Sequence, residues 1–274
     1  MNGASIFSPP RPSIVAAIVR RDFRITRSYR LAFVLEAVYG LLQLAVYFFI
    51  SRSFVTVSSA ELHGAPSYFA FAAVGAILGA VVGATGSEIG SRLREEQLTG
   101  TFEALGLQPL TSGELCVGLI SFPFLYSLVR ATVYLVIAGF WMHLDASRAS
   151  WLGLVLVLIA AGLAFAPLGI ISAALVLLFK RGQIVAALVL LGMTLVGGSV
   201  FPISSLPNWL EPIGHIVPIR FAFDGARSAL FRGDGWGIDV IALAGFSLAL
   251  WPLALGLFAW ALRHARRSGT LSQY

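Results

Sequence analysis

The chain has 274 residues, of which 58% are hydrophobic and only 12% are charged, and its formal net charge is +6. A water-soluble protein of this length cannot bury so much apolar surface, so the composition excludes an ordinary soluble domain and indicates several membrane spans. The positive charge lies in short segments between apolar runs, which is typical of loops facing anionic lipid and argues against nucleic-acid binding.

The segment before the first apolar run, residues 12–30, predicts an amphipathic helix. At 100° per residue, Arg20, Arg24 and Arg27 share one face, and isoleucine and valine side chains lie opposite. We expect this helix to lie flat in the cytoplasmic interface of the membrane. The alternative is an ordinary positively charged flank of the first span.

Six apolar stretches are long enough to cross a hydrocarbon core about 30 Å thick. The stretches are residues 31–50, 67–90, 115–140, 151–179, 184–201 and 238–262. The predicted fold class is therefore an all-α integral membrane protein with six transmembrane helices. In the second span, Gly75, Gly79 and Gly83 recur at four-residue spacing, a ridge of small residues that lets another helix approach closely.

The distribution of Lys and Arg orients these spans. The N-terminal tail, the loop around 92–114, the turn at 180–181 and the C-terminal tail together hold 13, whereas the other three loops hold five. Both termini are therefore expected in the cytoplasm, in a multi-pass protein of the plasma or inner membrane. We expect a single domain, with a tail and interface helix over 1–30, the bundle over 31–262 and a second tail over 263–274.

The loop between the second and third spans, residues 91–115, is too long for a simple turn. Gly100 lets the chain bend, Thr101 can cap a short helix, and Pro109 ends that helix. Thr111 and Glu114 have the spacing of a capping box at the start of the third span. We expect a short helix that offers acidic and apolar side chains to a partner, the alternative being a helical hairpin that contacts nothing.

The segment between the fifth and sixth spans, residues 201–233, is too apolar for a solvated loop and too rich in proline to span the membrane. We expect two short re-entrant helices that dip into the outer leaflet and pack on the bundle. Arg220, Asp224 and Arg227 fall on one face of the second helix, so they can form ion pairs. The four prolines of this segment are Pro202, Pro207, Pro212 and Pro218.

Together these two segments resemble the type-2 ABC exporter permease family, which includes drug, lipid and polysaccharide exporters. The likeness extends over nearly the whole chain in topology, but rests on specific residues only in the two segments. In the first it is carried by Glu95-Glu-Gln-Leu-Thr-Gly-Thr-Phe-Glu-Ala-Leu105 with Pro109 behind. In the second it is carried by Phe201-Pro202, Leu206-Pro207-x-Trp209-Leu210, Pro218 and Asp224-Gly225-x-Arg227.

The resemblance implies a mechanism. Two such chains would pair, as a homodimer or a heterodimer, and each would sit on a separate nucleotide-binding ATPase subunit that alone binds ATP and Mg²⁺. Closure of the ATPase would rock the membrane halves and move substrate outward. The coupling residues would be Glu95, Glu96, Thr99, Gly100, Thr101, Phe102, Glu103, Leu105 and Pro109. The re-entrant residues would be Pro202, Pro207, Trp209, Pro218, Asp224 and Arg227.

The chain itself lacks the motifs of an ATPase or a metalloenzyme. A P-loop requires a Gly-Lys pair, but the only lysine, Lys180, follows Phe179. Glu211 and His215 lie one helical turn apart, which is too few ligands for a metal site. We therefore expect no catalytic, cofactor or metal site in this chain.

Arg130 is an unusual charge inside the third span, about 22 Å from its start. Counted from the helix starts, Glu36 lies about 13 Å away in depth, whereas Gln43 lies at a similar level. We therefore expect Arg130 to bond Gln43 or backbone carbonyls and to face the bundle or the translocation path. The alternative is that Arg130 snorkels to the outer interface.

Two other functional classes remain open. A self-sufficient secondary transporter or channel would show more ionisable residues near the midplane or broken helices in matching halves. A non-transporting membrane scaffold would leave the 91–109 segment without a partner. No feature of the sequence identifies a transported substrate.

Overall fold

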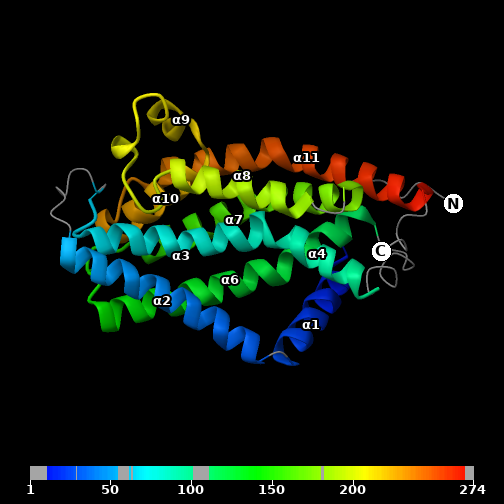
Figure 1. Cartoon of the computed structure of the whole chain (residues 1–274), viewed down its shortest axis with the longest axis horizontal. Coiled ribbons are helices and arrows are strands. Elements are labelled where there is room, and N and C mark those ends of the chain that lie inside the picture. The colour runs from blue at the N-terminus through cyan, green and yellow to red at the C-terminus, as the bar shows by residue number, and fades with distance from the viewer. Residues whose placement is uncertain are drawn as a thin grey trace.

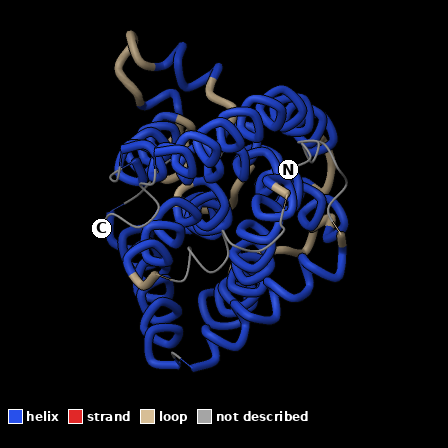
Figure 2. The backbone as a smooth tube through the Cα atoms, turned by 90° about the vertical axis from the view of Figure 1, so that its right-hand side faces the viewer, coloured by secondary structure: helices blue, strands red, loops and turns tan. Residues whose placement is uncertain are grey.

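The structure, a computed structural model, describes residues 11–28, 30–54, 62, 64–100, 111–179 and 182–268. Within these residues all regular elements are helices, as the tube in Figure 2 shows, so the predicted all-α class is confirmed. In chain order they are α1 Pro12–Ser28, α2 Arg30–Phe54, α3 Tyr68–Gly86, α4 Glu88–Leu98, α6 Ser112–Met142, α7 Trp151–Phe179, α8 Gly182–Val196, the 3-10 turn η1 Ile203–Ser205, α9 Glu211–Ile216, α10 Ile219–Arg227, the π turn η2 Ser228–Arg232 and α11 Trp236–Ser268.

Five of the described helices, α2, α3, α6, α7 and α11, are long and apolar enough to cross a membrane. The fifth expected span, 184–201, corresponds to α8, which ends at Val196 and has only 15 residues, a length of about 22 Å. This helix stops early because two glycines follow it, and Gly198 adopts a left-handed conformation with φ of 83°. The prediction that a helix continues to Phe201 is therefore wrong.

The bundle is built around α3 and α7, with α2 and α11 at its periphery. Most of α3 and α7 is buried, whereas the described side chains of α2 and α11 are largely exposed. Both central helices are rich in alanine and glycine, which lets their neighbours approach closely. The helices run roughly parallel to one long axis, with α1 crossing at an angle (Figure 1).

The two ends of the bundle differ. One end, here called the α1–α4 end, holds α1 and α4, and both the start of α1 and the end of α11 lie there (Figure 1). The other, the α9–α10 end, holds the short helices that precede α11. The predicted helix before the first span is confirmed as α1, and its Ile18 is buried against Gly118 of α6.

The predicted ridge of small residues on α3 divides into two parts. At Gly75 a Cβ atom would lie 1.8 Å from the backbone oxygen of Ser199, so only glycine allows this close approach. At Gly79 and Gly83 no atom lies within 4 Å of where a Cβ would be. The ridge therefore packs tightly at one point and leaves open space along the rest of its length.

This difference predicts opposite effects for two matched substitutions. Gly75→Ala forces a backbone shift and should destabilise the protein by about 1–3 kcal/mol. Gly79→Ala meets nothing and removes a helix-weakening glycine, so it should be neutral or stabilise by up to ~1 kcal/mol. Thermal unfolding of both variants in one detergent measures the difference, and equal midpoints would contradict the packing described here.

Candidate functional site

A cavity of about 480 Å³ lies between α2, α3, α6 and α8 and is here called the polar cavity. Gly79 and Gly83 line it, so the missing side chains on α3 help to create its volume. Unlike most of the bundle, it is lined by ionisable and polar side chains. These include Glu36, Gln43, Tyr47, Glu88, Arg130 and Tyr134.

The charged centre of the polar cavity is an ion pair between Arg130 of α6 and Glu36 of α2. Arg130 Nη2 also donates to the backbone oxygen of Ala80 at 3.3 Å. Tyr126 Oη donates to the Glu36 carboxylate at 3.4 Å, and Tyr134 Oη donates to the Glu36 backbone oxygen at 3.3 Å. Because an unpaired charge among apolar helices is costly, this network ties the peripheral α2 to α6.

The prediction that depth favours Gln43 over Glu36 as the partner of Arg130 is wrong. The start of α6 contacts the start of α1 through Arg11 and Glu114, and the whole of α1 lies between that point and the start of α2. The two spans therefore begin at different levels (Figure 1), and depths counted from their starts cannot be compared. Gln43 instead donates to Tyr47 Oη at 3.3 Å, although it lines the same cavity as Arg130.

A signal for this network is present in the sequence. Tyr126, Arg130 and Tyr134 recur every four residues and therefore lie on one face of α6. On α2, Glu36 and Gly40 have the same spacing, and Gly40 provides the room that the Tyr134 ring occupies. A search for polar residues at helical spacing on two spans would have paired these faces.

Arg227 of α10 is the largest fully buried side chain in the described part of the protein. Its Nη2 donates to the backbone oxygens of Phe71, Gly198 and Ser199 at 3.2, 2.8 and 3.0 Å. Its guanidinium carbon lies 3.5 Å from the centre of the Phe71 ring. One side chain therefore joins α10, α3 and the turn that follows α8.

The predicted ion pairs on α10 are confirmed. Arg220 Nε lies 2.9 Å from Asp224 Oδ2, and Arg227 Nη1 lies 3.9 Å from Asp224 Oδ1. The carbonyl contacts of Arg227, however, were not predicted, because a backbone oxygen leaves no trace in the residue pattern. They are shorter than the ion pair, so we regard them as the main interactions of Arg227.

The segment before α11 only partly packs on the bundle, as Figures 1 and 2 show. Two short helices, α9 and α10, occupy this segment, with Pro202 and Pro218 immediately before η1 and α10. The buried helix is α10, whereas α9 projects away and the loop before it exposes 73% of Trp209. This loop begins at Pro207, whose backbone oxygen accepts from Leu210 N at 2.8 Å.

Two ion pairs hold α1 against the helices at its end of the bundle. Arg21 Nη2 lies 2.6 Å from Glu96 Oε1 of α4, and Arg11 Nε lies 2.7 Å from Glu114 Oε1 of α6. Burial raises the pKa of Glu96, and the charge of Arg21 counteracts part of this rise. The capping box of Thr111 and Glu114 is confirmed, so Glu114 serves both α6 and α1.

The expected coupling residues lie next to this junction. Glu95 and Glu96 are on α4, and Thr99 Oγ1 donates to the backbone oxygen of Glu95 at 3.0 Å. Gly100 has a φ of 74°, which is the predicted bend. The remaining predicted coupling residues, which lie outside the described part of the chain, are Thr101, Phe102, Glu103, Leu105 and Pro109.

Comparison with known proteins identifies the family. Residues 15–231 match the ABC-2 type transporter family, which is well over half of the chain. The chain belongs to the ABC-2 type transporter family. This match takes in the polar cavity, Arg227 and the Arg21–Glu96 ion pair, and it confirms the resemblance drawn from the two loop segments. The chain is therefore a membrane subunit of an ABC transporter.

Individual relatives of this ABC-2 transporter are proteins named nodulation protein J. The one from Sinorhizobium fredii (strain NBRC 101917 / NGR234) is 27% identical over 196 residues, covering 69% of this chain and 73% of that protein. The one from Rhizobium leguminosarum bv. viciae is 27% identical over 218 residues, covering 78% and 81%. A third, from Neorhizobium galegae, is 27% identical over 174 residues, covering 61% and 63%.

The ion pair in the polar cavity of this ABC-2 transporter predicts strong coupling between its members. Glu36→Gln and Arg130→Gln each leave a charge among apolar helices and should each destabilise by about 1–3 kcal/mol. The double variant should lose less unfolding free energy than the two single variants added together, with a coupling energy of about 1–3 kcal/mol.

Unfolding free energies in mixed micelles measure this cycle. The matched control is Arg220→Gln with Asp224→Asn, an ion pair between residues four apart on one helix, whose coupling should be at most ~1 kcal/mol. Additive effects at Glu36 and Arg130 would show that the two side chains do not interact.

Proposed function

We propose that this ABC transporter membrane subunit works in a dimeric exporter, each copy seated on a separate nucleotide-binding subunit. The observation that carries the proposal is the junction at the α1–α4 end. Residues 101–110 connect α4 directly to α6, and α1 is tied to both helices by Arg21–Glu96 and Arg11–Glu114. Movement of the nucleotide-binding subunit against this connecting segment would therefore act directly on α6 and, through α4, on α3. Both α6 and α3 line the polar cavity.

Six membrane crossings with both termini in the cytoplasm fit this proposal. An even number of crossings would bring the start of α1 and the end of α11 to the same end of the bundle, where Figure 1 shows both. Five described helices are long enough to span, and α8 with the turn after it would supply the sixth crossing. The arginines of α1 support a cytoplasmic location for this end, at the plasma or inner membrane, with α1 in the interface.

The polar cavity is the part of the bundle suited to a translocation path. It is bordered by α2, whose described side chains are mostly exposed and of which only Leu44 is buried in the core, so a shift of α2 would disturb few core contacts. Arg130, Glu36 and Gln43 give it polar walls at membrane depth, where such groups mark transport routes. ATP and Mg²⁺ would bind only to the partner subunit, and rocking of the membrane halves would carry substrate outward.

Co-purification tests the proposal. The tagged chain, solubilised from its native membranes, should bring down a subunit with a Walker-type ATPase motif, identified by mass spectrometry. Glu103→Arg or Leu105→Arg should abolish this association, because each places a positive charge on the proposed coupling surface. The control is Ile216→Arg, since Ile216 is 77% exposed at the opposite end, and this variant should retain the ATPase.

Two results would contradict the proposal. If the unmodified chain brings down no ATPase, a self-sufficient transporter or a scaffold becomes the better description. If the ATPase stays bound to the variants at positions 103 and 105, the coupling surface lies elsewhere.

A further inference from the structure

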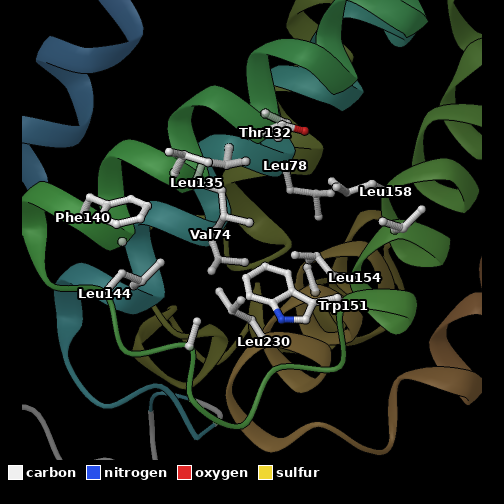
Figure 3. A pocket seen from close by; sticks show the side chains of 17 residues that line it. Val74, Leu78, Thr132, Leu135, Phe140, Leu144, Trp151, Leu154, Leu158 and Leu230 are labelled. Carbon is white, nitrogen blue, oxygen red and sulfur yellow. The ribbon is translucent and has the colours of Figure 1, made fainter.

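A second cavity, here called the apolar pocket, lies on the other side of α3 from most of the polar cavity and has a volume of about 450 Å³. Figure 3 shows Val74 and Leu78 of α3 between Leu135 of α6 and Leu154 of α7, with Leu230 of η2 near one end. The lining contains few polar groups. The hydroxyl of Thr132 already donates to the backbone oxygen of Leu128 at 2.9 Å.

The position of the apolar pocket shows what surrounds it. It lies between the C-terminal half of α6 and the N-terminal half of α7, both of which are long enough to cross a membrane. Phe140 and Trp151 line it and remain 81% and 56% exposed. Exposed aromatic side chains at helix ends gather at the boundary between hydrocarbon and headgroups. The pocket therefore opens to lipid at the α9–α10 end.

The size and lining of the pocket select a hydrocarbon ligand. An apolar cavity of ~150 Å³ in a protein core stays dry and binds benzene. This pocket has about three times that volume, so it has room for an elongated hydrocarbon chain. A polar ligand would lose its hydrogen bonds to water on entering, and apart from Thr132 and the Trp151 indole the lining side chains offer it no partners.

A cationic side chain lies close to the lipid boundary. Arg148 is exposed on the loop between α6 and α7, two residues after Ala146 and three before Trp151, both of which line the pocket. The one acidic residue of this loop, Asp145, accepts from the backbone nitrogen of Ser147 at 3.0 Å. Arginine suits a phosphate group, because its planar fork can donate two parallel hydrogen bonds.

We propose that the apolar pocket binds one acyl chain of a membrane phospholipid from the leaflet at the α9–α10 end, with Arg148 next to the lipid phosphate. The bound chain fills the space between α6 and α7 and supports α3 from the side opposite the polar cavity. This proposal requires only that the chain is inserted in a membrane, so it stands or falls independently of the ATPase partner and of the direction of transport.

Photo-crosslinking tests the site. The protein is reconstituted in vesicles of phosphatidylethanolamine and phosphatidylglycerol that contain phosphatidylglycerol with a diazirine on one acyl chain, and adducts are mapped by mass spectrometry. Adducts should concentrate on the peptides that carry Leu135 and Leu154. Gly139→Leu adds a side chain at a lining position where no atom lies within 4 Å, so it should reduce these adducts about tenfold.

The matched control is Gly245→Leu, at a glycine of α11 that is equally open but does not line the pocket, and it should leave the adducts unchanged. A second variant, Arg148→Gln, lies on the surface loop and should lower the adduct yield several-fold without filling the pocket. It also tests the proposal if Gly139→Leu fails to fold.

Two results would overturn the proposal. The first is adducts spread evenly over the lipid-facing helices and unaffected by either variant. The second is a disulfide between two copies carrying Phe140→Cys in a Cys116→Ala background, because a second copy of the chain would then cover the pocket.

Discussion

Hydrocarbon offers no hydrogen-bond partner, so each backbone group that leaves a helix at membrane depth must be satisfied by the protein itself. The chain meets this constraint where α8 ends early and exposes the carbonyls of Gly198 and Ser199. Arg227 donates to both of them and to Phe71, while the Phe71 ring covers its guanidinium. The desolvation of a fully buried charge is offset by these contacts, and the broken segment before α11 is thereby fixed to α3.

The lack of hydrogen-bond partners in hydrocarbon also shapes the polar cavity, because a charged side chain there needs a partner within the protein. Arg130 is almost buried in the bundle, and its charge is balanced by Glu36 on a helix that otherwise packs little. The glycines of α3 that create the cavity lie next to the one, Gly75, that allows the turn after α8 to approach. Glycine therefore provides both the close packing at one level of α3 and the open space at the next. This arrangement places a peripheral helix, a charge pair and a cavity side by side near the middle of the bundle.

Features set by local patterns could be predicted from the sequence. The amphipathic α1, the capping box of Thr111 and Glu114, and the short helices before α11 follow from periodicity, capping residues and prolines. Features set by the relative level of two helices could not be predicted from depths counted along each helix separately. The partner of Arg130 was misassigned because the sequence does not record that α6 begins far from the start of α2. For Arg227 only the ion pair with Asp224 could be predicted, because its main partners are backbone carbonyls, which every residue carries.

Cysteine labelling tests whether the polar cavity is a water-accessible route through the membrane subunit. The single native thiol is replaced by Cys116→Ala, and Gly79→Cys then places a thiol on the cavity wall where no atom lies within 4 Å. The account predicts that a charged, membrane-impermeant reagent labels this position in sealed vesicles, whereas Gly245→Cys on α11 reacts only with a lipid-soluble reagent. Labelling of Gly79→Cys by the lipid-soluble reagent alone would contradict the account.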